Sequence, residues 1–419
     1  VIWFDRAHNI VFDRLITGGL IGLSLYLSLL LAPLVLLWRY FYKNKTSDGY
    51  FIPVVFTLVI LAYFIQNFFI FEALVTYIPL FIVLSFMSRF CPSFMDNFSK
   101  SKKPYLISLI LGIILFLPVL FSFNIIPASA NRDFVQALIQ SKQGEYKETY
   151  AQFIDVLDRG TANNQEYRQH FGEFIVGLVN SSQNINQAWA NQAAIKAEQE
   201  FDKQIQEKPL NTRNYLMFMR FLNKTHQFNT ERLNKALELG AQALELSPTR
   251  PQIYYEIAYT QIYLGKHYYS LGQAEKTEHF FDQSVNNMQK AINLQNQVVE
   301  SYVNMVMVLF TVGRGQEAQF YLDEMDKMNL NYYRVDVLER MANSAIHSEN
   351  YEFTLKFYKE LTGLNSEHPE YWINLALSYA NLGEKEKAIA TAKKVGEFGG
   401  DYAQQSGLFI QDVLDGKYD

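Results

Sequence analysis

Long apolar runs dominate the first third of the chain, and a polar pattern with helical period replaces them from about residue 127. A transmembrane helix needs about 20 predominantly apolar residues to cross the hydrocarbon layer of a bilayer. Residues 15–38, 51–71 and 105–126 meet this length without a charged side chain. The pattern therefore predicts an integral membrane domain, followed by a domain built from amphipathic helices.

A fourth apolar run, 73–87, is shorter and follows Glu72 closely. It forms a separate helix after a tight turn, or it is a re-entrant segment that follows a single span. We take the first interpretation, which places about four helices in a transmembrane domain over residues 15–126. Residues 1–14 are then the end of a preceding loop, and residues 127–419 form the second domain.

Basic residues lie in two of the three connections between the apolar runs. The first connection carries three of them and the last carries four: Arg39, Lys43 and Lys45, then Arg89, Lys100, Lys102 and Lys103. The turn between the second and third runs has only Glu72. Because cytoplasmic loops are enriched in lysine and arginine, both basic connections are predicted to be cytoplasmic. The loop end at 1–14 and the second domain are then both extracytoplasmic.

The second domain contains an internal repeat that is clearest near its C-terminus. Apolar, small and turn-forming residues recur there at the spacing of a paired-helix unit: Trp372, Leu375, Ala376, Tyr379, Gly383, Ala388 and Ala392. Small Ala376 and Ala388 permit close approach of two helices, and Gly383 permits the turn between them. This pattern resembles the tetratricopeptide repeat (TPR). The predicted fold class is therefore all-α, with polytopic transmembrane helices followed by a TPR-like α-solenoid.

Weaker copies of the pattern precede this unit. Tyr302, Gly313 and Ala318 repeat its phase, and an insertion near residues 266–279 delays the second helix of an earlier unit. Stacked helix pairs form a superhelix, whose concave face is expected to bind a protein or peptide partner. An aromatic residue of the repeats is either an anchor for such a partner or a part of the core between the helices. Residues 402–414 are expected to cap the last pair.

Composition excludes several classes of function. The net charge of -5 disfavours nucleic acid, whose phosphates require a basic surface. The single Cys91 excludes a disulfide framework and a site with several thiolates. None of the seven histidines has the spacing of a zinc site, and no glycine-rich phosphate loop or nucleophile elbow occurs. We therefore expect neither a metal nor another cofactor.

One short motif precedes the first apolar run. His8 lies in the sequence Ala7-His8-Asn9, and the glycine-rich run LITGGLIG follows at 15–22. This arrangement resembles the O-antigen ligase and polymerase family, whose members have a His-Asn pair, a short helix and a glycine-rich start of a late span. The resemblance covers about residues 5–87, and some members also carry C-terminal TPR units. It implies that further spans precede Val1 in the full-length protein.

The resemblance implies transfer of a glycan outside the bacterial cytoplasmic membrane, from a polyprenyl diphosphate donor to an acceptor. His8 matches the family's functional histidine and would accept or orient the proton of the acceptor hydroxyl. Arg6 and Arg14 are nearby cations that would bind the diphosphate or serve as interfacial anchors. A helix that begins near Asn9 would direct its positive end toward a phosphate group.

The glycine-rich run and the repeats are also explained by a protein without catalytic activity. Gly18, Gly19 and Gly22 are expected to permit close packing of membrane helices. In the rival hypothesis the chain is a non-catalytic, membrane-anchored TPR scaffold for envelope assembly. Both hypotheses include membrane lipids and a protein or peptide as partners, and the enzyme hypothesis adds the lipid-linked glycan.

Overall fold

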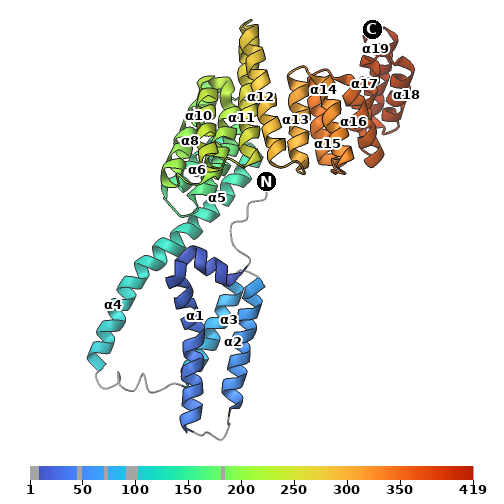
Figure 1. Ribbon diagram of the computed structural model, residues 1–419. Coiled ribbons are helices and arrows are strands. Elements are labelled where there is room, and N and C mark those ends of the chain that lie inside the picture. The colour runs from blue at the N-terminus through green and yellow to red at the C-terminus, as the bar shows by residue number, and fades with distance from the viewer. Residues whose placement is uncertain (1–8, 45–49, 70–73, 91–101, 181–184, 419) are drawn as a thin grey trace. The chain divides into compact units, whose positions relative to one another are not determined.

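The computed structural model is helical throughout its described residues, which confirms the all-α prediction (Figure 1). The chain groups into two compact units, Val1–Phe121 and Ser122–Asp419, and each is described by itself. The structure describes residues 9–44, 50–69, 74–90, 102–180 and 185–418.

Each of the four apolar runs forms a helix in the first unit. These helices are α1 (Ile10–Asn44), α2 (Phe51–Phe69), α3 (Leu74–Ser88) and α4 (Lys102–Leu120). Among the described residues, three stretches are long and apolar enough to cross a membrane: Ile10–Lys43, Phe51–Phe69 and Leu109–Gln143. The last of these stretches comprises most of α4, a π-helical turn at Phe121–Ile125 and α5. Helix α3 has 15 residues and is shorter than a full span.

Helix α1 bends sharply at Gly19 (Figure 1). Gly19 has φ 62° and ψ -165°, a backbone conformation that glycine adopts without the steric cost of a Cβ atom. In a straight helix, the eight residues from Arg14 to Gly22 would rise about 12 Å. Instead, a Cβ atom built on Gly22 would lie 3.6 Å from the Arg14 carbonyl oxygen. The first turns of α1 therefore lie against the start of the following helix.

The three glycines have different surroundings, and none of their described contacts is with another apolar helix. Nothing described lies within 4 Å of a Cβ atom built on Gly18 or Gly19. Gly22 permits a close approach, but the approaching segment is the start of α1 and not another membrane helix. Gly19 therefore serves the bend, which brings Ile10 into a buried cluster with Tyr26 of the same helix.

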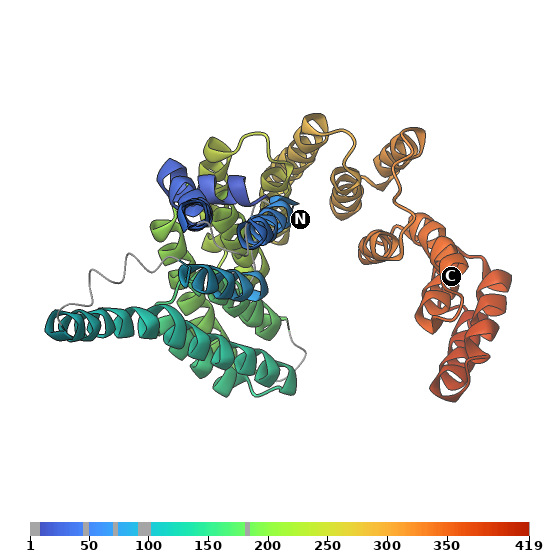
Figure 2. The ribbon, with the colours of Figure 1, turned by 90° about the horizontal axis from the view of Figure 1, so that it is seen from below.

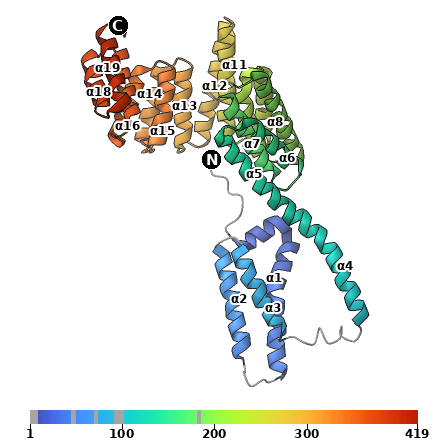
Figure 3. The same cartoon turned by 180° about the vertical axis from the view of Figure 1, so that it is seen from behind.

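The second unit is a succession of helix pairs joined by short turns (Figures 1 and 3). Helices α13 to α18 have 12 to 14 residues each, and Figure 2 shows these later pairs following one another along a curved path. The helices are α5 (Ile126–Gln143), α6 (Tyr146–Asp158), α7 (Asn164–Val179), α8 (Gln187–Glu207), α9 (Thr212–Thr225), α10 (Glu231–Leu246), α11 (Pro251–Ser270), α12 (Ala274–Leu294), α13 (Val299–Thr311), α14 (Gly315–Lys327), α15 (Val335–His347), α16 (Tyr351–Leu364), α17 (Pro369–Asn381), α18 (Lys385–Gly396) and α19 (Gly400–Leu414), with a 3-10 turn at His226–Phe228.

The insertion that the sequence indicates near 266–279 is built as additional helical turns. Helices α11 and α12 have 20 and 21 residues, whereas the helices of the next pair have 13 each. The two long helices approach closely at Gly265, where a Cβ atom would overlap the ring of Phe281. The repeat therefore keeps its paired-helix form, and the insertion lengthens one pair without adding a long loop.

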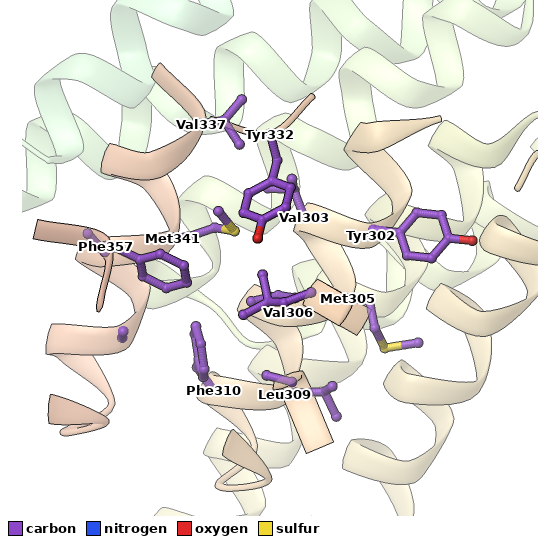
Figure 4. Close-up of a cluster of buried hydrophobic side chains, with 14 of the residues drawn as sticks. Tyr302, Val303, Met305, Val306, Leu309, Phe310, Tyr332, Val337, Met341 and Phe357 are labelled. Carbon is purple, nitrogen blue, oxygen red and sulfur yellow. The ribbon is translucent and has the colours of Figure 1, made fainter. Parts of the chain in front are cut away.

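Successive pairs share one buried core (Figure 4). Val306 and Phe310 of α13 lie in it with Met341 of α15 and Phe357 of α16, each at most 1% exposed. The ring centroids of Phe310 and Phe357 are 6.3 Å apart. Because neighbouring pairs bury the same cluster, each pair depends on the next for its stability.

Five of the turns within pairs have a left-handed residue two positions before the second helix, whereas the turn before α10 does not. Glycine occupies this position before α6, α12, α14 and α18, as in Gly313 (φ 78°) and Gly383 (φ 74°). The turn before α16 uses Glu349 instead, with φ 55°. A side chain in this conformation costs roughly 1–2 kcal/mol. Glu349 is therefore a strained position in an otherwise regular turn.

We expect Glu349→Gly to raise the free energy of unfolding by up to about 1 kcal/mol, because relief of the left-handed strain exceeds the greater chain entropy of glycine. The matched variant Gly383→Ala should lower it by about 1 kcal/mol for the converse reason. Urea unfolding followed by circular dichroism in detergent measures both. A shift of the same sign in the two variants would contradict this account of the turns.

Candidate functional site

The first candidate site lies at the start of α1, where Asn9 caps the helix. Its side-chain Oδ1 accepts hydrogen bonds from the backbone N–H groups of Val11 (2.9 Å) and Phe12 (3.2 Å). Its carbonyl oxygen accepts one from the N–H of Asp13 at 2.8 Å. The helix thus begins at Ile10, immediately after the His-Asn pair in the sequence, and its N-terminal end carries the positive end of the helix dipole. His8 and Arg6 themselves lie outside the described residues.

Arg14 connects the start of α1 to α3. Its guanidinium donates a hydrogen bond to the hydroxyl of Tyr77 and lies 5.9 Å from the centroid of that ring. The same guanidinium lies 5.4 Å from the centroid of Tyr26, which is further along α1. Arg14 is therefore held between two aromatic rings within the first unit. This placement is compatible with both sequence interpretations, phosphate binding and interfacial anchoring.

Further polar groups are buried near this end of the unit. Asp13 is 2% exposed and Asn67 of α2 is 1% exposed. Asn67 donates from Nδ2 to the carbonyl oxygen of Tyr63 at 3.0 Å, and Thr17 donates to the carbonyl oxygen of Asp13 at 2.6 Å. Burial of an ionisable group is costly unless the group has partners, and such groups often mark functional positions. Sequence reasoning did not select Asp13, although a carboxylate directly before a span was a visible signal.

Nothing in the sequence indicated the aromatic partners of Arg14. Tyr26 and Tyr77 are far apart in the chain and lie within apolar runs, where tyrosine is common. Only the bend in α1 and the packing of α3 bring both rings to one guanidinium.

A second candidate site is a polar ladder on the first helices of successive pairs in the second unit. Asn304 of α13 is its centre: its Oδ1 accepts from the hydroxyl of Tyr259 (2.9 Å) on α11 and from Nη2 of Arg340 (3.2 Å) on α15. Arg340 also donates to both carboxylate oxygens of Glu300, at 3.1 and 2.8 Å. One network thus joins three consecutive first helices.

The ladder begins one pair earlier, on α9, which contacts Glu256 of α11. Its carboxylate pairs with Arg220 of α9 at 2.9 Å, and Asn223 donates to its carbonyl oxygen at 3.2 Å. Thr260 donates to Oδ1 of Asn223 at 2.8 Å. These bonds replace the hydrogen bonds to water that are lost on folding, because all three side chains are buried: Asn223, Glu256 and Thr260.

The ladder continues toward the C-terminus through tyrosine hydroxyls. Tyr358 belongs to the second helix α16 and bridges the first helices on either side: it donates to Asn343 of α15 at 3.3 Å and accepts from Asn374 of α17 at 3.2 Å. Tyr371 of α17 donates to the carboxylate of Glu339 of α15. The ladder therefore presents amide and hydroxyl groups, together with charges that are paired within the protein.

The local surroundings fix the protonation states of the ladder. The carboxylate of Glu300 raises the pKa of Arg340, so this guanidinium stays charged. Burial raises the pKa of Tyr259 far above its ordinary value, and burial also raises the pKa of Tyr358 to about 12. For Tyr371, burial and its hydrogen bond to Glu339 raise the pKa to about 12. These hydroxyls are neutral donors at physiological pH.

The residues of the clearest repeat occupy different environments. Leu375, Ala376, Ala388 and Ala392 are buried between helices. Trp372 is half-buried: its Nε1 donates to the carbonyl oxygen of Ser366 at 2.8 Å, and the ammonium of Lys394 lies 4.6 Å from its ring centroid. Tyr379 is half-buried, and the ammonium groups of Lys359 and Lys387 lie within 5.6 Å of its ring centroid. Gly383 provides the left-handed turn.

In the part of the chain that the structure describes, no group of three or more histidine, cysteine, aspartate or glutamate side chains could hold a metal ion. The described chemistry thus consists of hydrogen-bonding groups, paired charges and aromatic rings.

Comparison with known proteins finds likenesses of structure only. No protein-family model matches the chain, and no curated protein matches it. A thermophilic TPR protein of Thermus thermophilus aligns at 14% identity over 50% of this chain and 98% of its own, with a TM-score of 0.36. YrrB, described as a TPR protein with an unusual peptide-binding site, aligns at 18% identity over 52% of this chain and 97% of its own, with a TM-score of 0.31.

A TPR protein of Parabacteroides merdae aligns over more of the chain. Its identity is 10%, its alignment covers 68% of this chain and 99% of its own, and its TM-score is 0.38. Likenesses at these TM-scores say nothing about function. The chain is an all-α protein whose solenoid of TPR-like pairs is defined by its own helix lengths, left-handed turns and shared core.

Proposed function

We propose that this chain supplies the late-span region of an O-antigen-ligase-like membrane glycosyltransferase, together with repeats that recruit a protein partner. The enzyme would transfer a glycan from a polyprenyl diphosphate donor to an acceptor hydroxyl outside the cytoplasmic membrane. The observation that carries the proposal is the form of α1. A short capped helix follows the His-Asn pair and ends at the Gly19 bend, where the glycine-rich span begins.

The proposed chemistry assigns a role to each group near this end of α1. His8 accepts the proton of the acceptor hydroxyl as its oxygen attacks the anomeric carbon of the donor sugar. The bond from that carbon to the diphosphate breaks, and the diphosphate leaves with the electron pair. The positive end of α1 and the guanidinium of Arg14 stabilise the negative charge of the leaving group.

The repeats supply the second half of the proposal. The buried groups of the ladder, such as Asn304, hold consecutive first helices together, and the Arg340–Glu300 pair is the partly exposed part that a partner can reach. The charged residues Arg340 and Glu300 neutralise one another, which favours a partner that is recognised by hydrogen bonds and shape. The ladder would serve a non-catalytic scaffold equally well, so the scaffold is the second candidate function.

In the full-length protein, His8→Ala should lower glycan transfer at least about 100-fold, because proton transfer by a positioned side chain contributes that much. The measurement uses a defined polyprenyl-diphosphate-linked glycan as donor. His347→Ala is the matched control, because His347 is an exposed histidine of the repeats. Transfer at the wild-type rate by the His8 variant would favour the scaffold.

The proposed topology places position 8 and the repeats on the same side of the membrane. In a Cys91→Ser background, single cysteines at position 8 and at Gln297 should react with a membrane-impermeant maleimide added to intact cells. A cysteine at Ser47, in the first basic connection, should react only after the cells are lysed. If positions 8 and 297 report opposite compartments, the proposed arrangement is wrong.

A further inference from the structure

The five second helices that follow a left-handed turn residue share one buried position, the ninth residue after that turn residue. In four of them the side chain at this position is large and at most 9% exposed: Phe153, Phe281, Leu322 and Tyr358. In α18 the turn residue is Gly383 and the same position holds Ala392. The last of these pairs therefore lacks the large side chain that the other four bury.

An apolar hollow of about 150 Å³ lies beside Ala392. Its walls come from α17 and α19 as well as from α18, and they include Ile373, Leu377, Gln405, Ser406 and Phe409. In the preceding pair, Tyr358 likewise reaches the first helices on either side, through Asn343 and Asn374. Leu377 is the counterpart of Asn343, because each lies six residues before its turn residue. The hollow thus corresponds to the place that the Tyr358 side chain fills.

Other contacts hold the walls of the hollow in place. Ser406 Oγ donates to the carbonyl oxygen of Ala392 at 2.6 Å, which fixes α19 against α18. Phe409 packs against Tyr418, with ring centroids 5.5 Å apart. Gln405 is exposed and Phe409 is only half-buried, so the hollow opens to solvent. It is therefore formed in advance and accessible from outside the chain.

The lining of the hollow favours one uncharged apolar group. Among the described residues that line it, none is charged. An apolar cavity of roughly this size can remain dry and admit a molecule such as benzene. The other pairs show which groups suit this place, since three of their four side chains are aromatic. The ring of Phe409 in the wall offers a further aromatic contact.

We propose that the hollow receives one aromatic side chain of the protein partner that the repeats recruit. The inference rests on the recruiting part of the proposed function and adds the chemistry by which the partner is recognised. The partner supplies the side chain that α18 lacks, and so completes the packing between α17 and α19. A buried aromatic anchor of this kind often carries much of the affinity of a protein interface.

Disulfide tethering on the full chain in detergent tests the hollow directly. In a Cys91→Ser background, Gln405→Cys places a thiol at the rim of the hollow. The protein is equilibrated with equal amounts of 2-phenylethanethiol and 2-mercaptoethanol together with their disulfides, and intact-mass spectrometry measures the two adducts. Relative to a control cysteine, the phenylethyl adduct should be favoured at least about tenfold, because its ring leaves water.

Gln411→Cys provides the matched control, since Gln411 is an exposed residue of the same helix outside the hollow. Combined with Gln405→Cys, Ala392→Leu fills the hollow with the side chain that Leu322 has at the equivalent position. Ile373→Phe fills it from α17 instead. Each filling substitution should reduce the preference to that of the control. An equal preference at positions 405 and 411, or one that survives both filling substitutions, would overturn the site.

Selection of a random displayed peptide library on the full chain tests the partner. The enriched peptides should share an aromatic residue, and its replacement by alanine should weaken binding at least about tenfold. Ala392→Leu in the chain should have a similar effect. Failure to enrich peptides with an aromatic residue, or equal binding by the wild-type chain and Ala392→Leu, would contradict the proposal.

Neither measurement involves glycan transfer, so the two proposals fail separately. If His8→Ala transfers glycan normally while the hollow prefers the phenylethyl group, the catalytic role fails and the docking site stands. If transfer depends on His8 but the hollow has no preference, the docking site fails alone.

Discussion

The bend at Gly19 is the constraint on which the first unit depends. A straight α1 would carry its first turns away from the rest of the helix, and Arg14 would be about 18 Å along the axis from Tyr26. The positive φ of Gly19 turns these residues back, so the guanidinium reaches both Tyr26 and Tyr77. The burial of Ile10 beside Tyr26 and the contact of Arg14 with Tyr77 both depend on this one backbone conformation, whereas the cap at Asn9 is local to the first turn.

The two units bury their apolar side chains to different extents. In the first unit many apolar side chains are exposed and the few buried groups include polar ones such as Asn67, an arrangement compatible with membrane association. In the second unit the apolar side chains of α11 to α17 form a shared interior, and charged groups pair at the surface. The mean hydropathy of the whole chain hides this contrast, because the apolar first unit and the more polar second unit offset one another.

The polar ladder adds hydrogen bonds and ion pairs between consecutive helix pairs of the solenoid. Hydrogen bonds such as the one from Tyr259 to Asn304 join residues of consecutive first helices that are 45 positions apart in sequence, so they fix the relation between consecutive pairs. The shared apolar core provides most of the stabilisation between pairs. The ladder adds directional contacts, because a misplaced pair would leave buried amide and carboxylate groups unsatisfied.

The sequence by itself determined the two kinds of unit, the helical character of each apolar run and the paired-helix repeat. These features follow from local hydrophobic patterns and from turn glycines such as Gly383, which act within a few residues. Tertiary structure decided that Gly19 serves a bend, that Glu349 replaces a turn glycine and that Tyr26 and Tyr77 meet at Arg14. The physical reason is that backbone direction at one residue and contacts between distant residues leave no periodic trace in the sequence.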